Sequence, residues 1–358
     1  MRVLLDSIMM KNFRFCLLVI FGLGLTGCSS VEYYWQAVEG HTDILNREQP
    51  IEQILQEPDL DPELRGYLEE IQQARDFASN ELGLPDNDSY RNYADVRREY
   101  VIWNVIATEE FSVTPQQWCF PFAGCVSYRG YFDKADAQEF AEKLSNEGMD
   151  TYVAGARAYS TLGWFDDPLL NTMLYRDEAL RVGVIFHELA HQQLYVQDDT
   201  AFNEAFAMVV AQEGVRRWFL SRKDEQAYEA FLQSEKRRAE FNSLLKQTRE
   251  KLERLYSKNL EPDLMRKDKQ AIFQQLKQEY LVLKKSWNNY DRYDAWMKQS
   301  LNNSNLALVA TYHELVPSLK AYLHEVDGDL PKFYQQMQEL GRMPKAERHQ
   351  KLARQDSK

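Results

Sequence analysis

The sequence predicts an α+β protein that is predominantly helical, with a small antiparallel sheet beside one central helix. Runs rich in β-branched and aromatic residues are concentrated in residues 99–159, as is typical of short strands. Before and after this block, apolar residues recur at spacings of three and four, which indicates amphipathic helices. A strongly apolar helix near residue 187 also carries two histidines four positions apart, and this pattern is the starting point for function.

The composition is that of a folded globular protein. Of the 358 residues, 44% are hydrophobic and 27% are charged, which argues against a disordered chain. A mean hydropathy of −0.57 excludes a polytopic membrane protein. The formal net charge of −12 argues against a general nucleic-acid binder, because phosphate binding needs a basic surface. We therefore expect no nucleic-acid partner.

The first 27 residues are expected to be a leader peptide. Lys11 and Arg14 precede a short apolar run that ends in Leu25-Thr-Gly-Cys28, and this run is too short to span a bilayer comfortably. Small residues before a Cys at this place resemble a bacterial lipobox, which implies cleavage before Cys28 and lipidation of its thiol. An ordinary signal peptide, or an anchor helix with an incidental Cys, is the alternative.

The lipobox implies a location in the bacterial cell envelope, with the protein facing the periplasm. The membrane is then a partner only through an N-terminal lipid anchor. Ser29 follows the Cys, where an Asp would signal retention in the inner membrane, so the outer membrane is favoured over the inner.

Two further cysteines belong to the exported chain. Cys119 and Cys125 flank a short segment that contains Pro and Gly, and in an oxidising compartment this arrangement predicts a disulfide. Metal ligation by the two thiols is the alternative, although a spacing of five residues between cysteines is not a standard zinc motif.

Local signals place the elements of the first half. Helices are predicted to begin at Pro50 and after Asp61-Pro62, because an Asp cap and an early Pro are typical of helix starts. Strands are expected at residues 99–107, 126–132 and 151–159, and a short helix at 136–146.

The second half is predicted to be helical. Asp177 is expected to cap a helix that runs to about residue 196, and Thr200 to cap the next, at about 201–222. A final helix near 306–326 is expected to be interrupted or kinked at Pro317. Two series of apolar residues predict an antiparallel hairpin within 224–300: Phe241, Leu245, Thr248, Leu252, Leu255 and Phe273, Leu276, Tyr280, Leu283, Trp287.

The residues with recognisable chemistry are found in Phe186-His-Glu-Leu-Ala-His191. Residues four apart on a helix lie on one face, so His187 and His191 can both reach a single Zn²⁺ ion. Glu188 projects beside that position, where it can act as general base toward a metal-activated water. The alternative is a pair of hydrogen-bonded core histidines, but polar groups in an apolar helix are costly unless they have partners.

A catalytic zinc site needs a third protein ligand and an open coordination position. Twelve residues separate Glu204 from His191, so Glu204 lies early in the next predicted helix, and a short loop can aim it back at the two imidazoles. Asp198 and Asp199 are alternatives that are more simply explained as loop or cap residues. The expected cofactor is one Zn²⁺ per chain, held by His187, His191 and Glu204.

Two resemblances follow from these residues. His-Glu-x-x-His followed by Asn203-Glu-Ala-Phe-Ala207 resembles the zinc signature of gluzincin peptidases, although the spacing here is shorter and Met208 stands where thermolysin-like enzymes have an Asp. Most of the exported chain is more similar to a bacterial family of zinc aminopeptidase lipoproteins. The strings that carry this second resemblance are Trp118–Cys125, Tyr128–Phe132, Ala158–Pro168, Phe186–His191 and Phe202–Ala207.

The resemblance implies a zincin-like core and a peptide substrate, and it favours an aminopeptidase over an endopeptidase. In His-Glu-x-x-His peptidases an edge strand upstream of the zinc helix binds the substrate backbone, and residues 151–163 occupy that place. The developing oxyanion needs a hydrogen-bond donor, and the candidates are Tyr159, Tyr195 and Tyr312.

Charged side chains are also needed if the substrate carries free termini. The acidic residues available for a substrate amine are Asp166, Asp167 and Glu213. Arg157 can meet a substrate carboxylate, although an ordinary salt bridge is the simpler expectation.

These inferences divide the chain into four parts and leave two alternative functions. We expect a signal peptide at 1–27, N-terminal helices plus a catalytic core at 28–222, a helical region at 223–340 and a polar, frayed tail at 341–358. One alternative is a non-catalytic envelope lipoprotein that binds a protein partner, of a kind the sequence does not identify, through its helical hairpin. The other is a zinc hydrolase that acts on a non-peptide amide.

Overall fold

The computed structural model describes residues 28–120, 124–161, 163, 165–307 and 315–355. The chain divides into two compact units, one ending at Asn46 and the other comprising Arg47–Lys358. The first unit contributes helix α2 (Cys28–Asn46), and the predicted leader at 1–27 lies outside the described residues. Among the described helices, none is long and apolar enough to cross a membrane.

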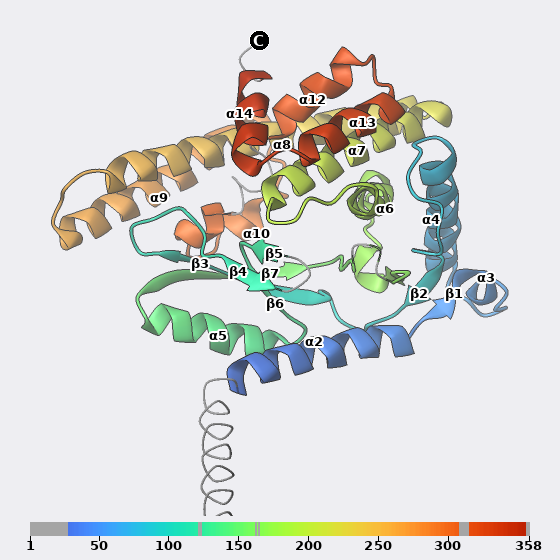
Figure 1. Ribbon diagram of the computed structural model, residues 1–358, viewed down its shortest axis with the longest axis horizontal. Helices are drawn as coiled ribbons and strands as arrows, with labels where there is room; N and C mark the ends of the chain where they lie inside the picture. Colours follow the sequence, from blue (N-terminus) through green and yellow to red (C-terminus); the bar gives the residue numbers. More distant parts are fainter. Residues whose placement is uncertain (1–27, 121–123, 162, 164, 308–314, 356–358) are drawn as a thin grey trace, which may run out of the picture. The chain divides into compact units, whose positions relative to one another are not determined.

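The larger unit is a predominantly helical α+β fold, as predicted (Figure 1). Its main sheet has the order β6-β3-β7, with β6 at Arg129–Tyr131, β3 at Ile102–Glu109 and β7 at Met149–Ala156. All pairs in this sheet are antiparallel, and β7 is an edge strand. Helix α5 (Lys134–Asn146) contacts both β3 and β7.

Two smaller sheets accompany the main sheet. One has the order β1-β2-β8, formed by Gln49–Pro50, Asn92–Ala94 and Leu169–Leu170, with the β2–β8 pair parallel. The other is a hairpin of β4 (Trp118–Phe120) and β5 (Gly124–Val126), which the Cys119–Cys125 disulfide closes. The disulfide prediction is therefore confirmed, whereas the strand predicted at 126–132 is divided between β5 and β6.

Helices α6 (Glu178–Gln193) and α7 (Thr200–Ser221) pack against each other and form the centre of the helical layer. Helix α4 (Pro62–Asn80) contacts both, and fully buried phenylalanines at 186, 202 and 206 fill the interior. Asp61 and Asp177 cap α4 and α6 as predicted. The cap of α7 is a correction, because Asp199 rather than Thr200 accepts the backbone N–H of Phe202.

The predicted helical hairpin is confirmed as α8 (Glu225–Tyr256) and α9 (Pro262–Ser286). The two predicted apolar series meet in one buried cluster that includes Phe241, Leu252 and Leu276. The short helix α10 (Asp294–Met297) follows, with Met297 in the same cluster.

The end of the described chain differs from the prediction. Helices α12 (Val316–Glu325) and α13 (Leu330–Gly341) are followed by α14 (Lys345–Gln355), where polar composition predicts a frayed tail. Arg348 and Leu352 are almost fully buried, so α14 is held by its packing and its ion pair despite its polar surface. Pro317 lies in the first turn of α12, where Pro is well tolerated. Short helices at Ile51–Ile54 (α3) and Asn171–Met173 (η1) are the remaining elements among the described residues of this unit.

Candidate metal centre

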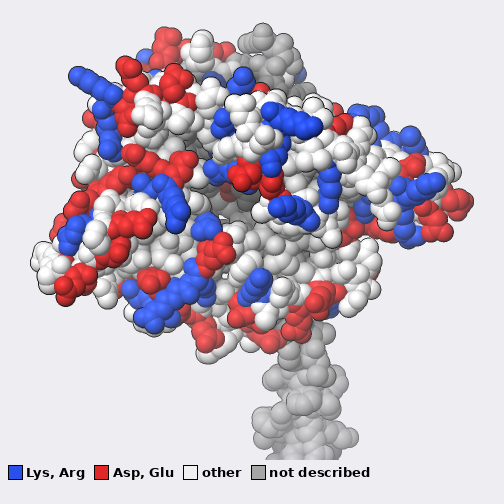
Figure 2. Space-filling view, turned by 180° about the vertical axis from the view of Figure 1, so that it is seen from behind, with Lys and Arg blue, Asp and Glu red and all other residues white. Residues whose placement is uncertain are grey.

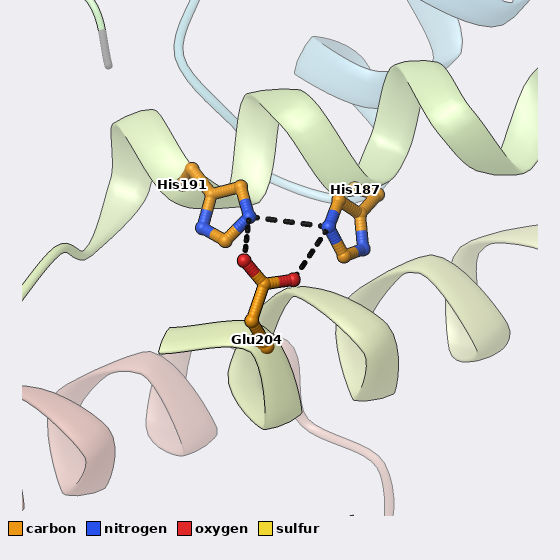
Figure 3. A group of neighbouring side chains, drawn as sticks. All are labelled: His187, His191 and Glu204. Atoms are coloured by element: carbon orange, nitrogen blue, oxygen red, sulfur yellow. Dashed lines mark hydrogen bonds and ion pairs between the residues drawn. The ribbon is translucent and has the colours of Figure 1, made fainter. Parts of the chain in front are cut away.

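His187, His191 and Glu204 converge on one point between α6 and α7 (Figure 3). The Nε2 atoms of the two histidines are 3.1 Å apart. One carboxylate oxygen of Glu204 lies 3.3 Å from His187 Nε2, and the other lies 3.7 Å from His191 Nε2. All the potential ligand atoms lie within 4.8 Å of one another, so the three side chains can hold a metal ion together.

The two helices account for this convergence. The histidines are four residues apart on α6, which places both rings on the same face. After a short loop, α7 runs back beside α6, and Glu204 lies in its first turns opposite the rings (Figure 3). The structure thus brings together the three residues that the sequence analysis selected.

The loop between the helices is held by the residue before Glu204. Asn203 Nδ2 donates to the backbone oxygen of Val196, and Asn203 Oδ1 accepts from the backbone N–H of Val196, both at 2.8 Å. Asn203 is buried, so these bonds are protected from water. The motif contains the Asn-Glu pair, but the sequence alone does not predict this role for Asn203.

Asp199 and Asp198, the alternative ligands, are engaged elsewhere. Asp199 is buried against α14, where its carboxylate lies 2.5 Å from an Arg348 nitrogen and 2.9 Å from His349 Nε2. Burial by itself raises the pKa of Asp199, but the hydrogen bonds and charges of His349 and Arg348 lower it below the ordinary value. Asp199 therefore fixes the start of α7, as a cap residue does.

Asp198 joins the same loop to the disulfide hairpin. Its Oδ1 atom accepts a 2.7 Å hydrogen bond from the backbone N–H of Cys125. Gly124 makes this approach possible, because a Cβ atom there would lie 2.4 Å from Asp198 Oδ1 and its φ of +73° favours glycine. Lys345 Nζ donates to the backbone oxygen of Asp198 from α14 at 2.7 Å.

The protonation states suit a cation-binding role. Burial lowers the pKa of His191 to about 4, so its ring is neutral near pH 7 and a ring nitrogen is free to bind a metal. Burial also opposes protonation of His187, but the hydrogen bond and charge of Glu204 raise its pKa overall. A cation at this point would replace that proton as the partner of the Glu204 carboxylate.

Glu188 lies next to this centre in a buried environment. Burial raises its pKa to about 7, against the charge of His187, and the nearby charges of Glu204 and Asp167 add to the shift. Such a carboxyl can both accept and donate a proton near neutral pH.

Asp167 faces the same region but serves the preceding loop. Its carboxylate accepts hydrogen bonds from the Ser160 hydroxyl at 3.1 Å and from the Thr161 backbone N–H at 2.9 Å. Burial and the charges of Glu188 and Asp167 raise the pKa of Tyr90, which is fully buried beside them. Asp167 is therefore a positioning residue for the segment after β7.

A cavity of about 720 Å³ extends from His187 between α6, α7, α8 and α10. Much of its wall is apolar and includes Val184, Val215, Phe231, Phe241 and Trp296. This cavity is not predictable from the sequence, because its walls come from helices that are distant along the chain.

Charged side chains also line the cavity. Glu235 and Arg238 on α8 form an ion pair at 2.5 Å, and Arg292 adds a second guanidinium. The cavity therefore offers charged side chains of both signs within a largely apolar wall.

Two of the charged side chains predicted to meet substrate termini are engaged in ion pairs. Arg157 pairs with Glu99 at 2.8 Å, the simpler of its two expectations, and its guanidinium also lies 5.7 Å from the ring of Tyr175 in the cavity wall. Glu213 pairs with Arg216 and Arg217, and Asp166 is exposed.

The three tyrosines predicted as candidate oxyanion donors differ in their environments. Tyr159 packs its ring against Phe132 at 5.5 Å. The pKa of Tyr195 is raised by burial and by the charges of Glu204 and Asp198. Tyr312 lies outside the described residues.

Comparison with known proteins gives one family. No curated protein and no solved structure matches the chain. A family described as "Putative aminopeptidase" matches residues 32–352, a span that includes the metal centre, the cavity, the hairpin and most of α14. Because the match covers nearly the whole sequence, the chain belongs to this aminopeptidase family.

Proposed function

We propose that the protein is a zinc-dependent metallopeptidase that acts as an aminopeptidase. The observation that carries the proposal is the convergence of His187, His191 and Glu204 with Glu188 beside them. Two imidazoles and one carboxylate are a ligand set typical of catalytic zinc, with one position left for water or substrate. The family description supports the peptidase class.

The proposed chemistry depends on Glu188. When bound, zinc would lower the pKa of a water ligand and polarise the scissile carbonyl. Glu188 accepts a proton from the attacking water and then donates it to the leaving amine, a pair of roles favoured by a pKa near 7. His187, His191 and Glu204 are held by α6 and α7, so their positions are set before substrate binds.

Substrate binding is proposed to use the edge strand and the cavity. Strand β7 has only β3 as a partner in its sheet, and a peptide can add to such an edge. The cavity beside His187 is large enough for a bulky apolar side chain, and Glu235 supplies a carboxylate in its wall for a substrate amine. Tyr195 is the proposed oxyanion donor, because it lies in the short connection between α6 and α7, the two helices that carry the candidate ligands.

The decisive experiment compares wild type with Glu188→Gln. Purified protein is loaded with zinc and assayed on aminoacyl amides, on N-acetylated peptides and on cell-wall fragments. We expect the wild type to cleave the aminoacyl amides and the variant to retain zinc but lose activity by at least about a thousandfold, since both proton transfers fail. Equal activity in the two proteins would contradict the mechanism, and cleavage of cell-wall fragments alone would favour a non-peptide amidase.

We also propose that Cys28 carries a lipid that anchors the protein to the periplasmic side of the cell envelope, at the outer membrane. The lipobox-like residues before Cys28 support this. Mass spectrometry of the N-terminal peptide tests it, with Cys28→Ser as the control. A peptide that begins at Cys28 with an acyl modification is expected, and an unmodified thiol at this position would contradict the proposal.

A further inference from the structure

Helix α2 presents an unusual amount of apolar surface. Of the eleven exposed large apolar side chains among the described residues, five belong to this helix. Two of them, Trp35 and Val31, are each 69% exposed, and Val38 is 62% exposed. Tyr34 and Leu45 complete the set, at 45% and 38%. A contiguous exposed apolar surface of this kind usually marks a binding site.

The five side chains form one stripe. Val31, Tyr34, Trp35 and Val38 follow the spacing i, i+3, i+4, i+7, and Leu45 is two heptads after Val31. At about 100° per residue, all five lie within an arc of roughly 100°. The acidic residues of the helix, Glu32, Glu39 and Asp43, project together to one side of this stripe. We call these five residues the α2 stripe.

We propose that the α2 stripe lies on the surface of a lipid bilayer. The helix begins at Cys28, the residue expected to carry the lipid anchor, so the stripe starts three residues from the acyl chains. At about 1.5 Å per residue, the whole stripe then lies within roughly 26 Å of the anchor and meets the headgroup region if the helix lies flat. An apolar stripe buried at this boundary adds to the membrane affinity that the lipid supplies, because binding strength scales with the buried apolar area.

The side chains also indicate which lipids are preferred. Trp and Tyr have an apolar body and a polar tip, which suits the boundary between headgroups and acyl chains. Helix α2 contains no Lys or Arg and three acidic residues, so attraction to anionic lipids cannot drive binding. The stripe should therefore prefer a zwitterionic surface, and its binding should be insensitive to salt.

The test separates the stripe from the lipid. The chain from residue 28 onward is prepared with Cys28→Ser, so that it carries no acyl group, and is mixed with vesicles of phosphatidylethanolamine and phosphatidylcholine or with vesicles rich in phosphatidylglycerol. The stripe variant is Trp35→Ser with Val38→Ser. The matched control is Leu281→Ser with Val282→Ser, an exposed apolar pair on α9 that is 49% and 71% exposed. Circular dichroism checks that each variant is folded.

We expect the parent and the control to sediment with zwitterionic vesicles, and the stripe variant to bind at least roughly tenfold more weakly, because it loses two inserted apolar side chains. Brominated lipids should quench tryptophan fluorescence in the parent and much less in Trp35→Phe. Three results would overturn the proposal: vesicle binding equal in parent and stripe variant, binding only to anionic vesicles, or a dimer that the stripe variant dissociates. None of these outcomes depends on peptidase activity.

Discussion

The side-chain amide of Asn203 satisfies both the backbone N–H and the backbone oxygen of Val196, with two hydrogen bonds of 2.8 Å. This pair closes the loop between the two helices that carry the candidate metal ligands. Glu204 follows Asn203 directly, so the direction in which the carboxylate points depends on how firmly Asn203 is held.

Asn203→Ala should weaken metal binding. The change leaves two backbone groups of Val196 unpaired in a protected place, which costs about 1–3 kcal/mol, and it releases the residue before Glu204. We expect a fall in zinc affinity of about tenfold to a hundredfold, measured by competition with a chelator. Asn146→Ala, at an exposed position at the end of α5, should change neither affinity nor stability.

Zinc content should depend on all three converging side chains. The wild type is expected to hold about one zinc ion per chain by elemental mass spectrometry, in line with a three-ligand site. His187→Ala, His191→Ala and Glu204→Ala should each lose most of it. A wild-type protein that holds no zinc, even after zinc is offered and the excess is removed, would exclude the metallopeptidase.

The Asp199–Arg348 pair should make stability depend on acidity. The pKa of Asp199 is lower in the folded protein than in the unfolded chain, so its contribution is fully present above the ordinary Asp pKa of about 4. That contribution disappears as the pH falls through the lower, folded value. Urea unfolding between pH 2.5 and pH 7 should show that the free energy of unfolding of the wild type falls as the pH is lowered.

Asp199→Asn tests the same pair directly. It should lower the free energy of unfolding by about 3–5 kcal/mol at pH 7, because Arg348 is left charged and buried. The free energy of unfolding that remains should depend less on pH in the acid range. Asp329→Asn is the control, since its partner Lys332 is 69% exposed and a surface pair contributes at most about 1 kcal/mol. A similar loss in both variants would mean that burial of the Asp199 pair has no special role.

The cavity beside His187 should control the choice of substrate side chain. Val184 lines it one helical turn before His187. Val184→Phe fills part of the space, and Val184→Ala enlarges it. We expect Val184→Phe to lower kcat/KM for a phenylalanyl amide relative to an alanyl amide by about tenfold or more, and Val184→Ala to leave or raise this ratio. Unchanged ratios in both variants would show that substrate does not enter the cavity.

Reduction of the Cys119–Cys125 disulfide should destabilise the loop that precedes Glu204. The hairpin donates the Cys125 N–H to Asp198, so its loosening removes one support of this loop. In the chain-entropy description, a disulfide that closes so short a segment contributes about 2 kcal/mol. Thermal unfolding with and without reductant should show this loss, and Cys119→Ala with Cys125→Ala should be insensitive to reductant.

Much of the fold could be predicted because its signals are local. The caps at Asp61 and Asp177, the seam from Phe241 to Trp287 and the placing of Glu204 after a short loop depend on neighbouring residues along the chain. Figure 2 shows acidic and basic side chains interspersed over one face of the molecule.

The features that could not be predicted from the sequence depend on contacts between residues that are distant along the chain. Arg348 meets Asp199 across 149 positions, and nothing in the polar composition of α14 signals a buried ion pair. The cavity is formed by side chains from four helices, so no single segment carries its pattern. The sequence predicts Thr200 as the cap of α7, whereas Asp199 caps it and has Arg348 and His349 of α14 as distant partners.

The contact between α14 and Asp199 also has a consequence for biosynthesis. A ribosome makes α6, α7 and their connecting loop well before it makes Arg348, so a nascent chain contains all the candidate ligands while the loop still lacks its buried counter-charge. The start of α7, which carries Glu204, should therefore gain its final support late, after α14 has docked. A chain clipped before α14 would keep every candidate ligand but lack the Arg348 and His349 contacts that hold Asp199 at the start of α7.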